Sequence, residues 1–69
     1  MPDVTIKTKT IGKYTASIEI VSGYFVSHYE TRLTEERGGQ AYTIREDVYS
    51  TEEKALAAFY RYSKWAKEN

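Results

Sequence analysis

The last twenty residues, Ser50–Asn69 (STEEKALAAFYRYSKWAKEN), decide the fold, because no other segment is long and periodic enough to predict a helix. Successive helical residues are rotated by about 100°, which places the apolar side chains of this segment along one side and most charged ones opposite. The apolar side comprises Ala55, Leu56, Ala58, Phe59, Tyr62 and Ala66. The pattern predicts a helix that docks on a sheet.

The two flanks of this helix support the same prediction. Ser50 and Glu53 have the spacing of a capping box, in which each side chain bonds a free backbone N–H at the helix start. Tyr60 falls towards the polar side and Trp65 at the boundary. The polar side mixes both signs of charge, whereas membrane-surface helices are rich in lysine there. We therefore expect a docking helix rather than a free amphipathic one.

Alternating apolar and polar residues predict two strands before this helix, at 4–11 and 14–21. Gly12-Lys13 between them fits a two-residue type II′ turn, because glycine at the first central position accepts a positive φ. Ser22-Gly23 predicts the next turn.

The third run, 24–34, alternates less cleanly, and neither side of it is plainly apolar. It is explained either by a β-bulge that switches faces midway or by cover on both faces, as in a homodimer. We expect 34–40 to be a flexible loop, because its charged residues lead into a glycine pair without an apolar anchor. The fourth run, 41–49, leads directly into the helix.

The predicted fold class is α+β. It is a four-stranded antiparallel β-meander with one C-terminal α-helix packed on one face, in a single domain at 1–69. The predicted core comprises Val4, Ile6, Ala16, Ile18, Ile20, Val26, Ile44, Val48, Leu56 and Phe59. The sheet face away from the helix is expected to carry Thr5, Lys7, Lys9, Thr15, Ser17, Glu19, Thr43, Arg45 and Tyr49, joined by Phe25, Ser27 and Tyr29.

Composition narrows the function classes. The 69 residues include 10 basic and 10 acidic side chains, so the charges cancel and a strongly basic nucleic-acid binder is not indicated. The absence of cysteine excludes disulfides and cysteine-based metal sites. No apolar run has the length of a membrane span, and the N-terminus does not resemble a signal peptide. We expect a cytoplasmic protein without a cofactor.

The sequence carries no recognisable catalytic pattern. His28 is the only histidine, and Glu30 shares its strand face two positions on. Such a pair can transfer protons, but no nucleophile accompanies it. No glycine pattern precedes a helix to cradle a phosphate. The prediction is a protein that is not an enzyme and has no metal site.

Aromatic residues are abundant: seven Tyr, two Phe and one Trp in 69 residues. A sheet with one helix hides few of them, and surface tyrosine is typical of binding sites. We therefore expect a protein-binding module, acting as a small inhibitor or adaptor that covers a larger partner. The expected contact residues are Phe25, Tyr29, Glu30, Glu35, Glu36, Arg45 and Tyr49.

The alternative is single-stranded nucleic-acid binding. Four antiparallel strands followed by a helix resemble the PC4-like and Pur-type single-strand binders. That resemblance implies an open sheet face on which aromatic side chains stack bases and basic ones follow the backbone. The residues for this role are Lys7, Lys9, Phe25, Tyr29 and Arg45. Zero net charge counts against it, because phosphate contacts dominate such affinity.

A tyrosine- and acid-rich set of residues supports a further resemblance. The set comprises Tyr24, Tyr29, Glu30, Glu35, Glu36, Tyr42, Glu46, Asp47 and Tyr49. In these residues, and in its cysteine-free sheet and helix, the chain resembles small accessory proteins of phages and mobile elements, including anti-CRISPR inhibitors. The resemblance implies a protein that blocks a larger nucleic-acid-handling machine by binding it.

Overall fold

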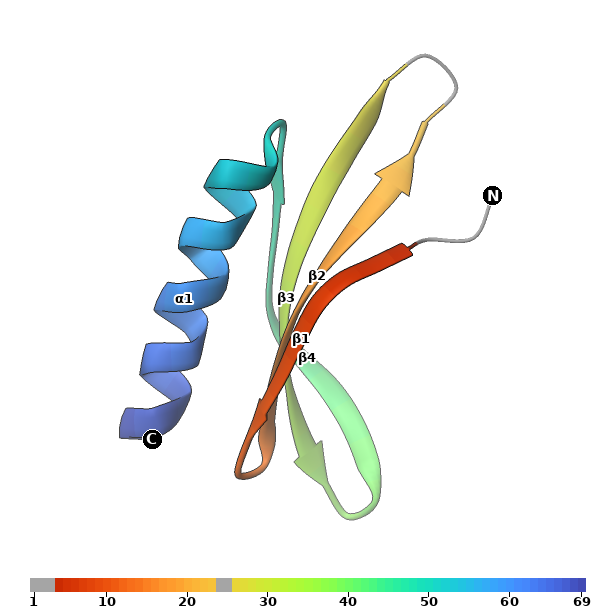
Figure 1. Ribbon diagram of the computed structural model, residues 1–69. Coiled ribbons are helices and arrows are strands. Elements are labelled where there is room, and N and C mark those ends of the chain that lie inside the picture. The colour runs from red at the N-terminus through yellow and green to blue at the C-terminus, as the bar shows by residue number, and fades with distance from the viewer. Residues whose placement is uncertain (1–3, 24–25) are drawn as a thin grey trace.

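The computed structural model describes residues 4–23 and 26–69, which form one antiparallel sheet and one helix. The elements are β1 (Val4–Ile11), β2 (Tyr14–Ser22), β3 (Ser27–Arg37), β4 (Gln40–Tyr49) and α1 (Glu52–Glu68). The strands lie in the order β1-β2-β3-β4, and α1 crosses one face of the twisted sheet (Figure 1). The α+β meander with a C-terminal helix is therefore confirmed.

Glycines close both tight hairpins. Gly12 has a φ of 60° and no other residue type in the described chain has a positive φ, so Gly12-Lys13 fits the predicted type II′ turn. Gly38 and Gly39 have φ values of 56° and 84°, which fit a type I′ turn. The predicted loop at 34–40 is wrong, because β3 continues to Arg37 and only the two glycines turn.

The predicted bulge in the third strand is also wrong. The β2–β3 register is unbroken from Tyr14↔Glu35 to Ser22↔Ser27. The irregularities lie in the two edge strands instead. In β1 the register shifts between Thr5 and Lys7, and in β4 Ile44 is the extra residue.

These two bulges decide which side chains face α1. Residues that pair across two strands project from the same face of the sheet. An extra residue in one strand moves every later side chain of that strand to the opposite face. Lys7 and Lys9 pair with Ile18 and Ala16, which are buried under the helix. On the other edge, Arg45 pairs with the buried Leu33.

The prediction that Lys7, Lys9, Arg45, Tyr29 and Tyr49 lie on the open face is therefore wrong. Tyr29 pairs with Ile20 on β2 and with Tyr49 on β4, and both tyrosines pack against the core from the helix side. Val48 was expected under the helix, but it pairs with Glu30 and is 58 % exposed on the open face.

The core lies between α1 and the two central strands, β2 and β3. The buried apolar residues are Tyr14, Ala16, Ile18, Leu33, Ala55, Ala58, Phe59, Tyr62 and Ala66. Of the predicted core, Ala16, Ile18 and Phe59 are confirmed, and Ile20 and Leu56 are partly buried. The exposed members of the predicted core are Val4, Ile6, Val26, Ile44 and Val48. Four of these lie on edge strands, where the helix gives little cover, and Val26 precedes β3.

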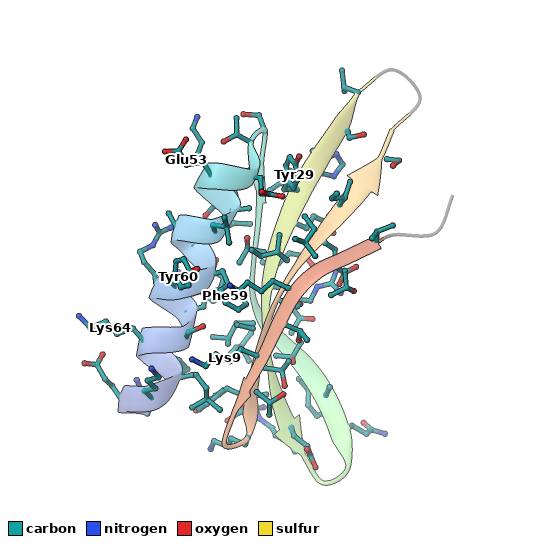
Figure 2. All side chains as sticks on the ribbon, viewed as in Figure 1. Lys9, Tyr29, Glu53, Phe59, Tyr60 and Lys64 are labelled. Carbon is teal, nitrogen blue, oxygen red and sulfur yellow. The ribbon has the colours of Figure 1, made fainter. Side chains whose placement is uncertain are left out.

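Thr51, rather than the predicted Ser50, caps α1. Thr51 has extended backbone geometry, and its Oγ1 accepts a hydrogen bond from the Lys54 N–H at 3.3 Å. The fully buried Ala55 lets the helix approach the sheet closely, and the Thr31 hydroxyl donates to the Ala55 carbonyl at 3.0 Å. Figure 2 shows Phe59 directed at the sheet and Lys64 directed away from it. One face of the sheet thus remains uncovered.

Candidate functional site

The residues predicted to contact a partner do not form one surface. Glu30 and Glu36 lie on the open face, because they pair with Val48 and Ala41. Four others lie on the helix face: Tyr29, Glu35, Arg45 and Tyr49. Phe25 lies outside the described residues.

Glu35 has a structural role instead. It is only 7 % exposed, and its carboxylate pairs with Lys13 at 3.1 Å and Arg37 at 2.5 Å. The hydrogen bond from Lys13, with a second from Arg37, holds the pKa of Glu35 below its usual value. Glu35 therefore links the turns of two hairpins and is not available as an acidic contact.

The open face is dominated by carboxylates around one guanidinium. Arg32 contacts Glu46 at 2.7 Å, Glu30 at 3.6 Å and Glu19 at 3.8 Å. The hydrogen bond to Glu46 is the main cause that raises the pKa of Arg32. His28 lies 3.9 Å from Glu30 on the same face. The basic open face that the nucleic-acid alternative requires is therefore not formed.

A groove on the helix side is the candidate site. It encloses about 450 Å³ between β4 and the C-terminal half of α1. Its lining residues are Leu33, Ile44, Arg45, Arg61, Tyr62 and Trp65. Leu33 is buried, whereas Ile44 is 36 % and Trp65 is 41 % exposed. A hollow of this size accommodates a small ligand or an anchoring side chain.

The sequence builds the groove from two local features. The bulge in β4 sets Ile44 and Arg45 against the single residue Leu33, so both reach the same hollow. On α1, Arg61 and Trp65 are four residues apart and therefore share one flank. Since α1 sits mainly on β2 and β3, the space above β4 stays open.

The two groove arginines differ from the other two arginines of the chain. Arg32 and Arg37 both form ion pairs with glutamates. Arg45 and Arg61 form no ion pair among residues 4–23 and 26–69. Arg61 makes only a long hydrogen bond of 3.5 Å to the Tyr49 hydroxyl. Two positive charges thus line the hollow, and in the part of the chain that the structure describes neither lies within ion-pair distance of a carboxylate.

Aromatic residues hold the helix wall of the groove in place. The Trp65 ring packs edge-on against Tyr14, with 4.9 Å between centroids. The Tyr62 hydroxyl donates to the Asp47 carboxylate. Burial, together with that hydrogen bond, raises the pKa of Tyr62 well above its usual value. Tyr62 is therefore a neutral, fixed donor that ties α1 to β4.

The opposite flank of α1 is already filled by the chain itself. The Lys7 ammonium lies 5.7 Å from the Phe59 ring centroid and 5.4 Å from that of Tyr60. It also lies 3.4 Å from the Tyr60 hydroxyl. Lys9 projects from β1 on the same side of the sheet (Figure 2). Lysine stems and a cation–π contact thus occupy this side.

Of the residues predicted for a site, only Arg45 reaches the groove. Ile44, Arg61 and Trp65 were not predicted as contacts. A signal for two of them was present, because an Arg–Trp pair with a spacing of four stands at the boundary of an amphipathic helix. The role of Ile44 depends on the bulge, which the residue pattern does not reveal.

No protein-family model, curated protein sequence or solved structure matches this chain. Within the described ranges, none of the groups of His, Cys, Asp and Glu has the arrangement needed to hold a metal ion. The described helix is too short and too polar to cross a membrane. The assignment of function therefore rests on the groove.

Proposed function

We propose that this chain is a non-enzymatic protein-binding module and that the β4–α1 groove is its binding site. One observation carries the proposal: two arginines that form no ion pair within the described residues flank a hollow walled by the only tryptophan of the sequence. Protein–protein hot spots are enriched in tryptophan, tyrosine and arginine around well-packed pockets. The groove has this composition, with Leu33 as an apolar floor.

The dimensions of the groove suit one anchoring side chain of a partner. A hollow of about 450 Å³ holds more than one aromatic ring, and the arginines at its rim add charge-assisted hydrogen bonds. A module of this kind acts by covering a functional surface of a larger protein, as an inhibitor or an adaptor does.

Single-stranded nucleic acid is the second candidate for the same groove. Trp65 would stack on a base while Arg45 and Arg61 contact phosphates. Asp47 lies beside Arg45 on the same face, however, and the open face carries three carboxylates around Arg32. A nucleic acid carries a phosphate at every nucleotide and would meet these carboxylates along its length, whereas a protein partner can present a single carboxylate to the two groove arginines. The proposal therefore commits to a protein partner.

A selection from a random peptide library tests the proposal. Recovered peptides are synthesised and titrated against the protein, with Trp65 fluorescence as the readout, because the single tryptophan lies in the groove. The double variant Arg45→Gln/Arg61→Gln should weaken binding by about tenfold or more, since each charged hydrogen bond contributes about 1.5–3 kcal/mol before solvent screening.

The matched control is Lys7→Gln/Lys9→Gln, which removes the same charge from the opposite edge of the sheet. It should leave peptide affinity nearly unchanged. Equal binding to the arginine variant and the wild type would refute the groove as the site. Tight oligonucleotide binding that falls steeply with salt would favour the second candidate.

A further inference from the structure

The outer edge of β4 adjoins the groove at Ile44 and Arg45. β4 is a ten-residue strand at the end of the sheet, and within the described chain it pairs only with β3. Its outward backbone N–H and C=O groups therefore have no strand partner among residues 4–23 and 26–69. An edge of this kind is a template for an added strand.

From this edge and the adjoining groove we infer that the partner is an extended, acidic peptide segment that binds as a fifth strand along β4. The inference rests on the proposed function, and it adds both the mode of binding and the chemistry of the partner. Backbone hydrogen bonds to β4 supply affinity in this mode, and alternate side chains entering the groove supply specificity.

The lining of the groove determines which side chains the segment carries. Side chains of an added strand point alternately to the helix face and the open face. A carboxylate on the helix face beside Arg45 would meet the guanidiniums of Arg45 and Arg61, which both line the groove. A large apolar side chain two positions away enters the hollow beside Ile44 and Trp65. A basic residue there would be repelled by two positive charges.

The other edge of the sheet is less suited to this mode. β1 is shorter, with eight residues, and its register shifts between Thr5 and Lys7. The space beside it is filled where Lys7 lies over Phe59 and Tyr60. Arg45 on β4 and Arg61 on α1 both line the groove beside the β4 edge, whereas on the β1 side Lys7 is already engaged by the two aromatic rings.

A second copy of this chain is a poorer occupant of the β4 edge. A two-fold antiparallel pairing of β4 with itself sets the central residue opposite its own copy. When the residue on the two-fold axis is Arg45, Glu46 or Asp47, its side chain lies opposite the same charge in the second copy. An acidic segment from another protein avoids this repulsion and neutralises the arginines.

A synthetic probe tests the inference. It is a capped peptide of about eight residues, mostly threonine for strand propensity, with one glutamate and one phenylalanine two positions apart. Titration is followed by the fluorescence of Trp65. A matched peptide with lysine in place of glutamate should bind at least about tenfold more weakly, because it reverses the charge facing the arginines.

Backbone methylation separates strand addition from side-chain docking alone. Two further peptides carry N-methyl groups on alternate residues, one on the odd and one on the even positions. Only one set of amides faces β4, so one peptide should lose binding and the other should keep it. If both methylated peptides bind like the parent, the strand-addition inference is wrong and the groove remains a protein site.

Three other outcomes are also decisive. If library-selected peptides bind the groove while the acidic probe does not, the chemistry of the inferred partner is wrong and the proposed function stands. If no peptide of either origin changes the fluorescence of Trp65, the proposed function itself fails. A mass measurement on the same sample completes the test, because self-association that blocks the probe would identify a second copy as the occupant.

Discussion

Tyr29 is the residue whose role changes most between the sequence and the structure. As an exposed anchor it would contribute to binding and not to stability. In the structure it pairs with Ile20 and Tyr49 on the helix face and packs, half-buried, against the core. Tyr29→Ala should therefore destabilise the fold.

The size of the effect follows from burial. Truncation of a fully buried aromatic residue to alanine costs about 3–5 kcal/mol, so a half-buried ring should cost about 1.5–2.5 kcal/mol. A chain of 69 residues has a total stability of about 3–10 kcal/mol. The midpoint of thermal unfolding should fall by about 6–20 °C.

Circular dichroism during thermal and urea unfolding measures this loss. Tyr42→Ala is the matched control. Tyr42, like Tyr29, is a tyrosine in a strand, but it lies on β4 near the hairpin turn and is 45 % exposed. Its cost should stay below about 1 kcal/mol. A change below about 0.5 kcal/mol in Tyr29→Ala would refute the placement of Tyr29 in the core, and with it the assignment of strand faces.

Three further predictions concern the contacts that hold the fold. The lowered pKa of Glu35 stabilises the folded state at pH values above 4.5, its ordinary pKa, and this stabilisation is lost as the pH falls below that value. Between neutral and acidic pH, the urea midpoint of Glu35→Gln should therefore fall less than that of the wild type. The raised pKa of Tyr62 stabilises the folded state at pH values below 10.0, its ordinary pKa, and this stabilisation is lost as the pH rises further. Under alkaline conditions, Tyr62→Phe should therefore lose less stability than the wild type, as measured by circular dichroism. Thr51→Ala removes the N-cap acceptor of α1 and should cost about 1 kcal/mol in urea unfolding, and no loss would mean that another group caps the helix.

The fold class was predictable because it depends on periodicity. The helical stripe of Ala55, Phe59 and Tyr62 is buried as the sequence indicates, and the strand alternation yields four strands in the expected order. Gly12 also marks its turn correctly. These features are local, so the residue pattern contains them.

The candidate site was not predictable, because two single-residue bulges control it. Alternation reveals which residues share a face only while the count of residues on paired strands is equal. The irregularity near Ile6 reverses the faces of Lys7 and Lys9, and the extra Ile44 does the same for Arg45 and the residues after it. The groove also requires that α1 covers β2 and β3 rather than β4, which depends on tertiary packing.

Chemical-shift mapping with the acidic probe peptide tests the central claim most directly. Backbone amide signals of the labelled protein are recorded during the titration and assigned to residues. The account predicts that the largest changes fall on 44–48 of β4 and 61–65 of α1, with only small changes on β1. Changes centred instead on the open face around Arg32, or on the β1 edge, would contradict the groove as the binding site.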